Sequence, residues 1–185
     1  VAMYHYDNGL FLTAGNLVID VRRRLPRCFV SHAHADHIAR YELALATPAT
    51  GRLFRHRLGS RHRVQMLPFG EPTRFGPLEL TTYPAGHCLG SAMLLADDGG
   101  QRLLYTGDFK LGPSATAKPA QLPKADILVM ECTFGRPQYR LPPRDVAIAQ
   151  LLRAVRSAFE TDRTPVIHAY ALGKAQEVTR ILTLA

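Results

Sequence analysis

The sequence predicts an α/β protein in which sheets are layered and helices lie outside them. The chain has 185 residues and is 46% hydrophobic, which is enough to bury the core of one domain or slightly more. Short apolar runs rich in β-branched residues come first, and strand-like and helical runs alternate later. This order favours stacked sheets that are flanked by helices.

The first half of the chain predicts strands interrupted by one helix. Each expected strand is a short apolar run bounded by turn residues. The expected strands are residues 9–12, 17–21, 27–30, 43–47, 64–67 and 77–83. Pro48 is favoured in the first turn of a helix, which we expect to reach Leu58 and to stop at Gly59.

The second half predicts further strands, followed by helices. The expected strands are residues 91–96, 102–106, 127–130 and 165–167. Residues 97–100 read Asp-Asp-Gly-Gly, which is typical of a hairpin turn. The run Ile127–Met130 is apolar throughout and favours a buried strand. Helical spacing of apolar residues predicts helices over about 143–159 and over 173–184.

The composition excludes several classes of protein. A formal charge of +8 favours a polyanionic partner such as nucleic acid, although an arginine-rich composition from GC-rich coding would give the same surplus. No apolar run approaches the roughly 20 residues of a membrane span, and the start shows no secretory signal. We therefore expect a cytoplasmic protein without a membrane partner.

Cys28, Cys88 and Cys132 lie in or beside apolar runs, which predicts small core residues rather than disulfides.

One segment concentrates metal-ligand side chains directly after a strand. Residues 31–37 read Ser-His-Ala-His-Ala-Asp-His, and His and Asp are natural ligands for zinc, manganese or iron. On an extended segment, His32 and His34 point to the same side. Asp36 and His37 follow where the chain turns, and would face a second metal. The alternative, a polar loop with incidental histidines, leaves these costly polar groups without a purpose.

His87 and Asp108 also follow strands. His87 lies in a glycine-flanked loop, and Asp108 lies in the sequence Thr-Gly-Asp. Taken singly, they would be a loop histidine and a capping aspartate. Loops at one edge of a sheet meet in space, so the three segments together predict a single site.

The H-x-H-x-D-H run, the strand-end histidine and the T-G-D motif together resemble the metallo-β-lactamase superfamily of metal-dependent hydrolases. The resemblance implies a four-layer αββα sandwich with a dinuclear site at one edge, holding two Zn²⁺ ions, with Mn²⁺ or iron as alternatives. The implied ligands are His32, His34 and His87 for the first ion, Asp36 and His37 for the second, and Asp108 between the two.

Two later motifs resemble the β-CASP branch of this superfamily, which comprises nucleic-acid-processing nucleases. They are the segments 130–135 and 171–177, and the nearest likeness is to bacterial exonuclease-like members, both the RNA 3′-end-processing type and those associated with DNA ligase. Glu131 in the first segment would bond a ligand histidine or position the nucleophile, or be an ordinary cap carboxylate. Lys174 in the second would meet a phosphate at a helix start, or be an exposed helix lysine.

A basic stretch on and after the first helix offers a second set of phosphate contacts. Arg55 and Arg57 belong to it. Such a stretch would track a nucleic-acid backbone, or it would be a solvated helix face.

The resemblance also predicts a domain organisation. Residues 1–160 would form the metallo-β-lactamase-type domain, and residues 161–185 would begin a β-CASP cap domain. The superfamily has one further metal-binding histidine and the branch has a proton-donating histidine, and both are expected after residue 185. The chain is therefore expected to be a truncated protein or a fragment.

The expected function is a dinuclear zinc phosphodiesterase, a nuclease that acts on RNA or single-stranded DNA in RNA processing or DNA repair. Two cations that share a water would turn it into a hydroxide nucleophile near neutral pH. The expected catalytic residues are Asp36, Asp108 and Glu131. The alternatives are a hydrolase of a small thioester, lactone or lactam, and an inactive fragment that binds nucleic acid. The sequence leaves protein partners unknown.

Overall fold

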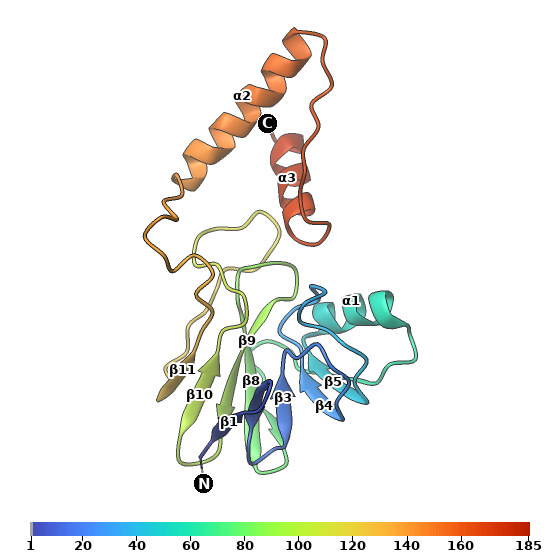
Figure 1. Ribbon diagram of the computed structural model, residues 1–185, viewed down its shortest axis with the longest axis vertical. Helices are drawn as coiled ribbons and strands as arrows, with labels where there is room; N and C mark the ends of the chain where they lie inside the picture. Colours follow the sequence, from blue (N-terminus) through green and yellow to red (C-terminus); the bar gives the residue numbers. More distant parts are fainter. Residues whose placement is uncertain (1) are drawn as a thin grey trace. The chain divides into compact units, whose positions relative to one another are not determined.

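The computed structural model describes residues 2–185 (Figure 1). Contacts divide the chain into two compact units, one ending at Glu131 and the other beginning at Cys132. Among the described residues, the first unit holds all of the strands and one helix, and the second holds two helices. Each unit is described by itself.

A six-stranded sheet is built from the start of the first unit, in the order β1-β2-β3-β4-β5-β6. Its strands are β1 (Tyr4–Tyr6), β2 (Leu10–Leu12), β3 (Leu17–Ile19), β4 (Arg27–Phe29), β5 (Leu43–Ala46) and β6 (Val64–Met66). The pairs β1–β2 and β2–β3 are antiparallel, whereas β3, β4, β5 and β6 are parallel. The carboxyl ends of those four strands therefore share one edge of the sheet.

A five-stranded sheet follows, in the order β11-β10-β9-β8-β7. Its strands are β7 (Thr73–Phe75), β8 (Leu78–Pro84), β9 (Ala92–Asp97), β10 (Arg102–Tyr105) and β11 (Ile127–Val129). The strands β7 to β10 pair antiparallel, and β11 pairs parallel with β10. The strands β8, β10 and β11 consequently end at the same edge.

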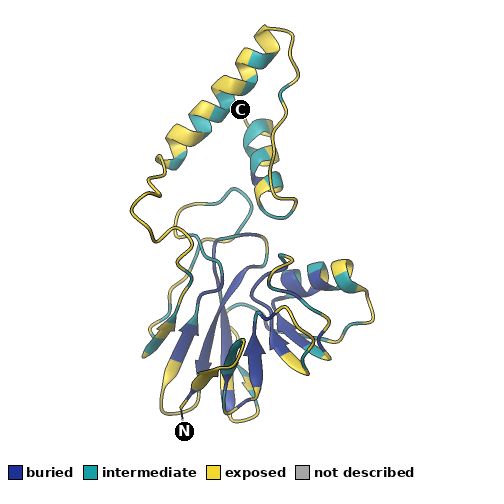
Figure 2. Cartoon of the chain, viewed as in Figure 1, coloured by how far each residue is buried: buried dark blue, intermediate teal, exposed yellow. Residues whose placement is uncertain are grey.

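The two sheets pack face to face around an apolar core, which Figure 2 shows as buried strands. Side chains alternate along a strand, so Leu17 and Ile19 of β3 join Leu80 and Leu94 of the other sheet in this core. Val18, between them, faces a second cluster that contains Phe54 of the helix. The fold is thus mixed α/β with stacked sheets, as the sequence predicts.

The helix α1 (Pro48–Leu58) begins and ends where the sequence places it. The side chain of Thr47 accepts a hydrogen bond from the backbone N–H of Thr50, and Pro48 occupies the first turn. The N–H of Gly59 closes the helix on the carbonyl of Arg55. This helix covers the outer face of the six-stranded sheet.

The second unit pairs the helices α2 (Arg144–Glu160) and α3 (Lys174–Thr183). The Nη2 of Arg144 donates to Oε1 of Glu177 over 2.9 Å and joins them. Glu177 is the only buried residue among the described residues of this unit. The unit therefore contributes little core.

Several sequence expectations are wrong. Residues 165–167 form no strand, and Val166 is 76% exposed. The strand β11 is not buried, because it lies at the sheet edge and leaves Leu128 58% exposed. Cys132 is exposed, unlike Cys28 and Cys88.

Two strands also differ from expectation, because β1 and β7 are absent from the prediction. The compact units divide after Glu131, and the domain boundary expected at residue 160 stays a prediction. The assignment of residues 161–185 to a cap domain stays a prediction.

Candidate metal centre

Polar side chains gather where strands of both sheets end. The strand β3 is followed by Asp20, β4 by Ser31 and His32, β8 by His87 and β10 by Asp108. The backbone N–H of Ala92 donates to the carbonyl of Ser31 over 2.9 Å and ties the sheets together there. The directions of the strands thus bring distant segments to one place.

Four of the predicted ligands form a compact group of donor atoms. His32, His34, His87 and Asp108 each offer one atom, and these atoms lie within 4.8 Å of one another. Nδ1 of His34 lies 2.8 Å from Nε2 of His32 and 3.2 Å from Nε2 of His87. Ligand atoms on a tetrahedral zinc with bonds near 2.0–2.1 Å are separated by about 3.3 Å. The nitrogen and oxygen donors therefore suit zinc in both kind and spacing.

The two carboxylate oxygens of Asp108 face two different groups of donor atoms. Oδ2 lies 3.8 Å from Nε2 of His32 and 3.7 Å from Nε2 of His87. Oδ1 lies 3.5 Å from Nε2 of His37, and that nitrogen lies 3.7 Å from Oδ2 of Asp36. The structure thus brings all six predicted residues together, with Asp108 between two sets.

Asp20 is the residue of this site that sequence reasoning missed. Its side chain is 3% exposed. Oδ1 accepts the backbone N–H of Ser31 over 2.8 Å, and Oδ2 accepts the hydroxyls of Ser31 (2.5 Å) and Tyr105 (3.0 Å). Nδ1 of His37 donates to the same Oδ2 over 3.0 Å. The only sequence signal is an acidic residue directly after a strand.

These bonds determine which ring nitrogen of His37 and of His32 is available to a metal. A carboxylate only accepts, so the proton of His37 sits on Nδ1 and its Nε2 faces Asp108. The hydroxyl of Ser31 donates to Asp20 and therefore accepts from Nδ1 of His32, 3.0 Å away. The Nε2 of His32 is left as a lone-pair donor. Carboxylate partners of this kind orient metal-binding histidines.

The backbone of Asp20 is held in an unusual conformation. Its φ is +46°, in a region that costs a non-glycine residue about 1–3 kcal/mol. Four hydrogen bonds to its carboxylate determine its position. Strain of this kind persists where the surroundings over-determine it, and it gathers at functional sites.

The histidine pKa values move in opposite directions. Burial and the neighbouring imidazoles of His37, His87 and His34 lower the pKa of His32 well below its usual range. Its ring is therefore neutral, as a metal ligand must be.

The pKa of His37 is raised instead. Burial alone would lower it, but the hydrogen bond to Asp20 and the charges of Asp20, Asp108 and Asp36 outweigh burial. The ring of His37 thus lies in a field that favours a cation.

Two glycines let the ligand loops approach other backbone. Gly107, before Asp108, has φ +55°, and an added Cβ would lie 2.7 Å from Cβ of Ser31. Gly86, before His87, has φ +77°, and an added Cβ would lie 2.1 Å from the carbonyl oxygen of Lys110. A side chain at either position would clash with these atoms, so the loop that carries the ligand or its neighbour would have to shift.

The remaining predicted site residues have structural partners. The backbone N–H of Glu131 lies 3.4 Å from Oγ1 of Thr106, the threonine of the T-G-D motif. Arg57 donates from Nη1 to the carbonyl of Ala33 over 2.9 Å, which ties α1 to the ligand segment.

The two other predicted phosphate contacts are also engaged locally. Arg55 donates from Nε to the carbonyl of His62 over 3.1 Å. Lys174, in the second unit, lies 3.5 Å from Glu177. The phosphate contacts of Arg55, Arg57 and Lys174, and the catalytic role of Glu131, stay predictions.

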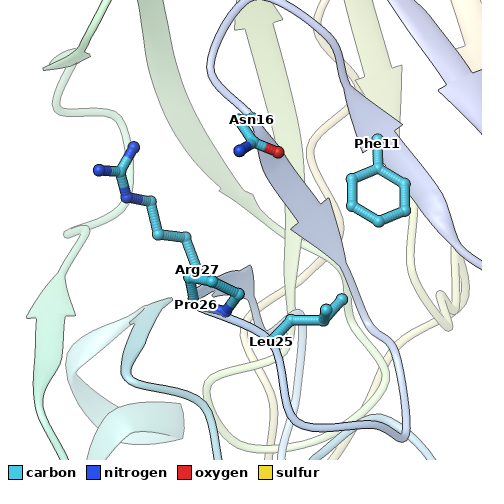
Figure 3. Close-up of a pocket in the computed structure, with 5 residues that line it drawn as sticks. All are labelled: Phe11, Asn16, Leu25, Pro26 and Arg27. Carbon is cyan, nitrogen blue, oxygen red and sulfur yellow. The ribbon is translucent and has the colours of Figure 1, made fainter.

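A cavity of about 200 Å³ lies at the opposite edge and carries no such chemistry. Figure 3 shows its lining residues, which are Phe11, Asn16, Leu25, Pro26 and Arg27. Asn16 precedes β3, and Leu25 and Pro26 precede β4. It therefore belongs to the amino ends of the parallel strands.

The stacked sheets and the histidine–aspartate cluster at one edge define a class of metal-dependent hydrolases. The chain belongs to the metallo-β-lactamase superfamily, because the family described as Beta-lactamase superfamily domain matches residues 18–169. This confirms the resemblance drawn from the sequence motifs.

The chain is similar to several individual proteins. The chain is 38% identical over 175 residues to a probable DNA ligase of Opitutus terrae, a match that covers 94% of the chain and 17% of the relative. It is 36% identical over 102 residues to the RNase J-like protein of Methanocaldococcus jannaschii, covering 54% of the chain and 24% of the relative. It is 33% identical over 156 residues to the 5′ exonuclease Apollo of Gallus gallus, covering 80% and 34%.

The nuclease names agree with the branch that the sequence resembles. The chain spans between about a sixth and a third of the length of these relatives. No helix of residues 2–185 is both long and apolar enough to cross a membrane.

Proposed function

We propose that this chain carries the dinuclear zinc centre of a cytoplasmic phosphodiesterase that cleaves RNA or single-stranded DNA. The observation that carries the proposal is Asp108, whose two oxygens face two different sets of donor atoms. The names of the relatives and the charge of +8 support a nucleic acid as the substrate.

Each predicted ligand has a place in this proposal. His32, His34 and His87 would hold one ion, Asp36 and His37 would hold the other, and Asp108 would serve both. When bound, the ions would supply Lewis-acid chemistry, which activates water and neutralises charge on a phosphoryl oxygen. Mn²⁺ and iron accept the same donors.

The protein's own residues prepare this chemistry. Asp20 accepts a hydrogen bond from the Nδ1–H of His37. Through the hydroxyl of Ser31, it also keeps the Nδ1–H of His32 pointing away from the metal centre. The side chain of Asp36 is 66% exposed, so an oxygen of its carboxylate faces the solvent. There it would orient an entering water and accept its proton.

The test combines metal content with cleavage. The chain is loaded with zinc, and bound zinc is measured by mass spectrometry of the metal. End-labelled single-stranded RNA and DNA are then incubated with the wild type, Asp108→Ala and, as a control, Asp7→Ala, which removes an exposed carboxylate elsewhere in the same unit.

We expect two zinc ions per chain and cleavage by the wild type and by Asp7→Ala. Asp108→Ala should bind fewer than two ions and leave both substrates intact. Cleavage that survives Asp108→Ala would refute the proposal. Hydrolysis of a chromogenic lactam or thioester without cleavage of nucleic acid would favour a small-molecule hydrolase instead.

A further inference from the structure

A second cavity lies on the metal-centre side of the sheets and has no assigned role. Its volume is about 410 Å³, within the range of about 300–1,000 Å³ typical of ligand pockets. Its walls come from the start of α1, from Pro68 and Phe69 after β6, from residues 88–91 after His87, and from Thr116 and Lys118 after β10. Because β5 and β6 run parallel to β3 and β4, these walls lie at the edge that carries the ligands.

The cavity and the candidate metal centre share one loop. The hydroxyl of Ser91, in the cavity wall, accepts the backbone N–H groups of His87 over 3.2 Å and of Cys88 over 3.1 Å. The carbonyl of Gly90 accepts the hydroxyls of Thr47 over 2.7 Å and Thr50 over 2.8 Å. The loop that carries His87 is therefore fixed to α1, and an occupant of the cavity lies beside it.

The lining combines positive charge with apolar and aromatic surface. Among the described residues that line it, Arg52 and Lys118 are the only charged ones, and both are exposed cations. Leu89 is 55% exposed, and Phe69 is half-buried. Nζ of Lys118 lies 5.3 Å from the centroid of the Phe69 ring. Cations beside an aromatic platform are what proteins use to hold single-stranded nucleic acid.

The start of α1 adds little attraction for a phosphate. Pro48 has no N–H, and the N–H of Thr50 is already bonded to the hydroxyl of Thr47. Attraction for an anion must therefore come from Arg52 and Lys118.

We propose that this cavity holds one nucleotide of a single-stranded substrate, next to the bond that the metal centre cleaves. The base lies against Phe69 and Leu89, and the adjoining phosphates lie beside Arg52 and Lys118. A base that stacks on Phe69 displaces the ammonium of Lys118 toward a phosphate. This inference rests on the proposed nuclease function and extends it to substrate positioning.

The test measures binding separately from cleavage. Fluorescence anisotropy of end-labelled U6 and dT6 oligonucleotides is followed over a range of salt concentrations, with the metal removed by a chelator to prevent cleavage. The variants are Arg52→Ala, Lys118→Ala and Phe69→Leu, which keeps an apolar contact with the core that Phe69 packs against. Arg27→Ala is the matched control, because Arg27 lies over Phe75 at 5.8 Å and lines the cavity at the opposite edge.

Each class of variant has its own expected signature. Loss of one phosphate contact should flatten the slope of log K against log salt by about 0.7 for a single strand, so each cation variant should show this change. Phe69→Leu should keep the slope and weaken binding about fivefold or more, the lower bound for loss of a stacked base. Oligonucleotides with one abasic position should locate that base, because one of them should be insensitive to Phe69→Leu.

The outcomes separate the two proposals. If the wild type cleaves but the cavity variants bind as the wild type does, the cavity inference is wrong and the nuclease proposal stands. If the cavity variants weaken binding as expected but no cleavage occurs with zinc, the cavity is a nucleotide site and the nuclease proposal fails. If the wild type binds no oligonucleotide, both are overturned. An equal effect of Arg27→Ala would show nonspecific charge attraction and would also overturn the cavity inference.

Discussion

The two edges of the same sheets differ sharply in chemistry. At the carboxyl edge, the hydroxyl of Ser31 links Asp20 to His32, and Nε2 of His32 lies 3.8 Å from Oδ2 of Asp108. At the amino edge, the cavity of Figure 3 has one charged side chain, Arg27, and no titratable cluster among the described residues. The same apolar cluster lies between the two sheets at both edges, so core packing does not explain the difference.

Strand direction does explain it. A strand that ends at an edge delivers its following loop there, so loops far apart in the chain converge. His32, His87 and Asp108 meet for this reason. The cost of burying polar groups at that edge is offset because, in residues 2–185, every buried side-chain nitrogen and oxygen has a partner. The comparison predicts that variants at the carboxyl edge change chemistry, whereas variants at the amino edge change at most stability.

The largest effect should come from His32→Ala. His32 is fully buried, and the change removes a proposed ligand. Zinc affinity should fall by more than about a hundredfold, the upper limit for loss of an outer partner, and cleavage should disappear. Isothermal titration with zinc and the cleavage assay measure this. Arg27→Ala should keep the zinc affinity and the cleavage rate within about twofold of the wild type. Equal losses in the two variants would mean that the two edges do not differ in function.

The next effect should come from Asp20→Asn, which keeps the shape of the side chain but removes its charge and one acceptor. Outer partners of metal ligands are worth about 10–100-fold in affinity, so zinc should bind about that much more weakly. Ser31→Ala should act through His32 alone, since Ser31 relays Asp20 to that ring. Separate affinities for the two ions would show this, and an effect of Ser31→Ala on both ions alike would contradict the relay.

Two glycines with nearly the same backbone provide a matched pair for stability. Gly107 at the carboxyl edge has φ +55°, and Gly76 in the turn before β8 has φ +59°. An added Cβ meets Ser31 at 2.7 Å at the first position and nothing within 4 Å at the second. The left-handed conformation costs alanine about 1–2 kcal/mol, and overpacking adds about 1–3 kcal/mol.

Gly107→Ala should therefore lower the free energy of unfolding by more than Gly76→Ala does. Urea denaturation measures both values. Only the first variant should also reduce zinc binding, because Asp108 follows Gly107. Equal losses of stability would mean that the close approach to Ser31 relaxes without cost.

A feature of the fold or of the site could be predicted when neighbouring residues in the sequence carry its pattern. The ligands His32, His34 and Asp36 carry a local pattern that the sequence displays, and α1 has its cap and its stop written in neighbouring residues. Asp20 has no such pattern. Its role arises from partners as distant as Tyr105, which only the folded chain brings near.

The errors have the same origin. A β-branched run such as residues 165–167 becomes a strand only if another strand pairs with it, and none of the described strands does. The strand β1 has no buried residue, so no alternation of apolar side chains marks it. The second cavity is assembled from four separate segments, and no single segment reveals it.

The smallest effect should be a pH dependence of the free energy of unfolding, to which two histidines of the carboxyl edge contribute in opposite directions. In the zinc-free chain, the raised pKa of His37 means that the folded state binds a proton more tightly than the unfolded state does. Its contribution to stability is complete below the unfolded value of about 6.5 and is lost as the pH rises through the raised value. The lowered pKa of His32 acts in reverse, because the unfolded state alone takes up that proton as the pH falls below about 6.5.

Urea denaturation across pH in the presence of a chelator separates these contributions. His37→Gln should destabilise the chain more at pH 5.5 than at pH 8.5, and His32→Gln should make stability less sensitive to acid. With zinc present, His37→Gln should instead destabilise the chain more at pH 8.5 than at pH 5.5. The reason is that a proton on Nε2 and the metal compete for the same lone pair beside Asp108 and Asp36. A profile of His37→Gln that runs parallel to the wild type with and without zinc would mean that His37 holds neither proton nor metal.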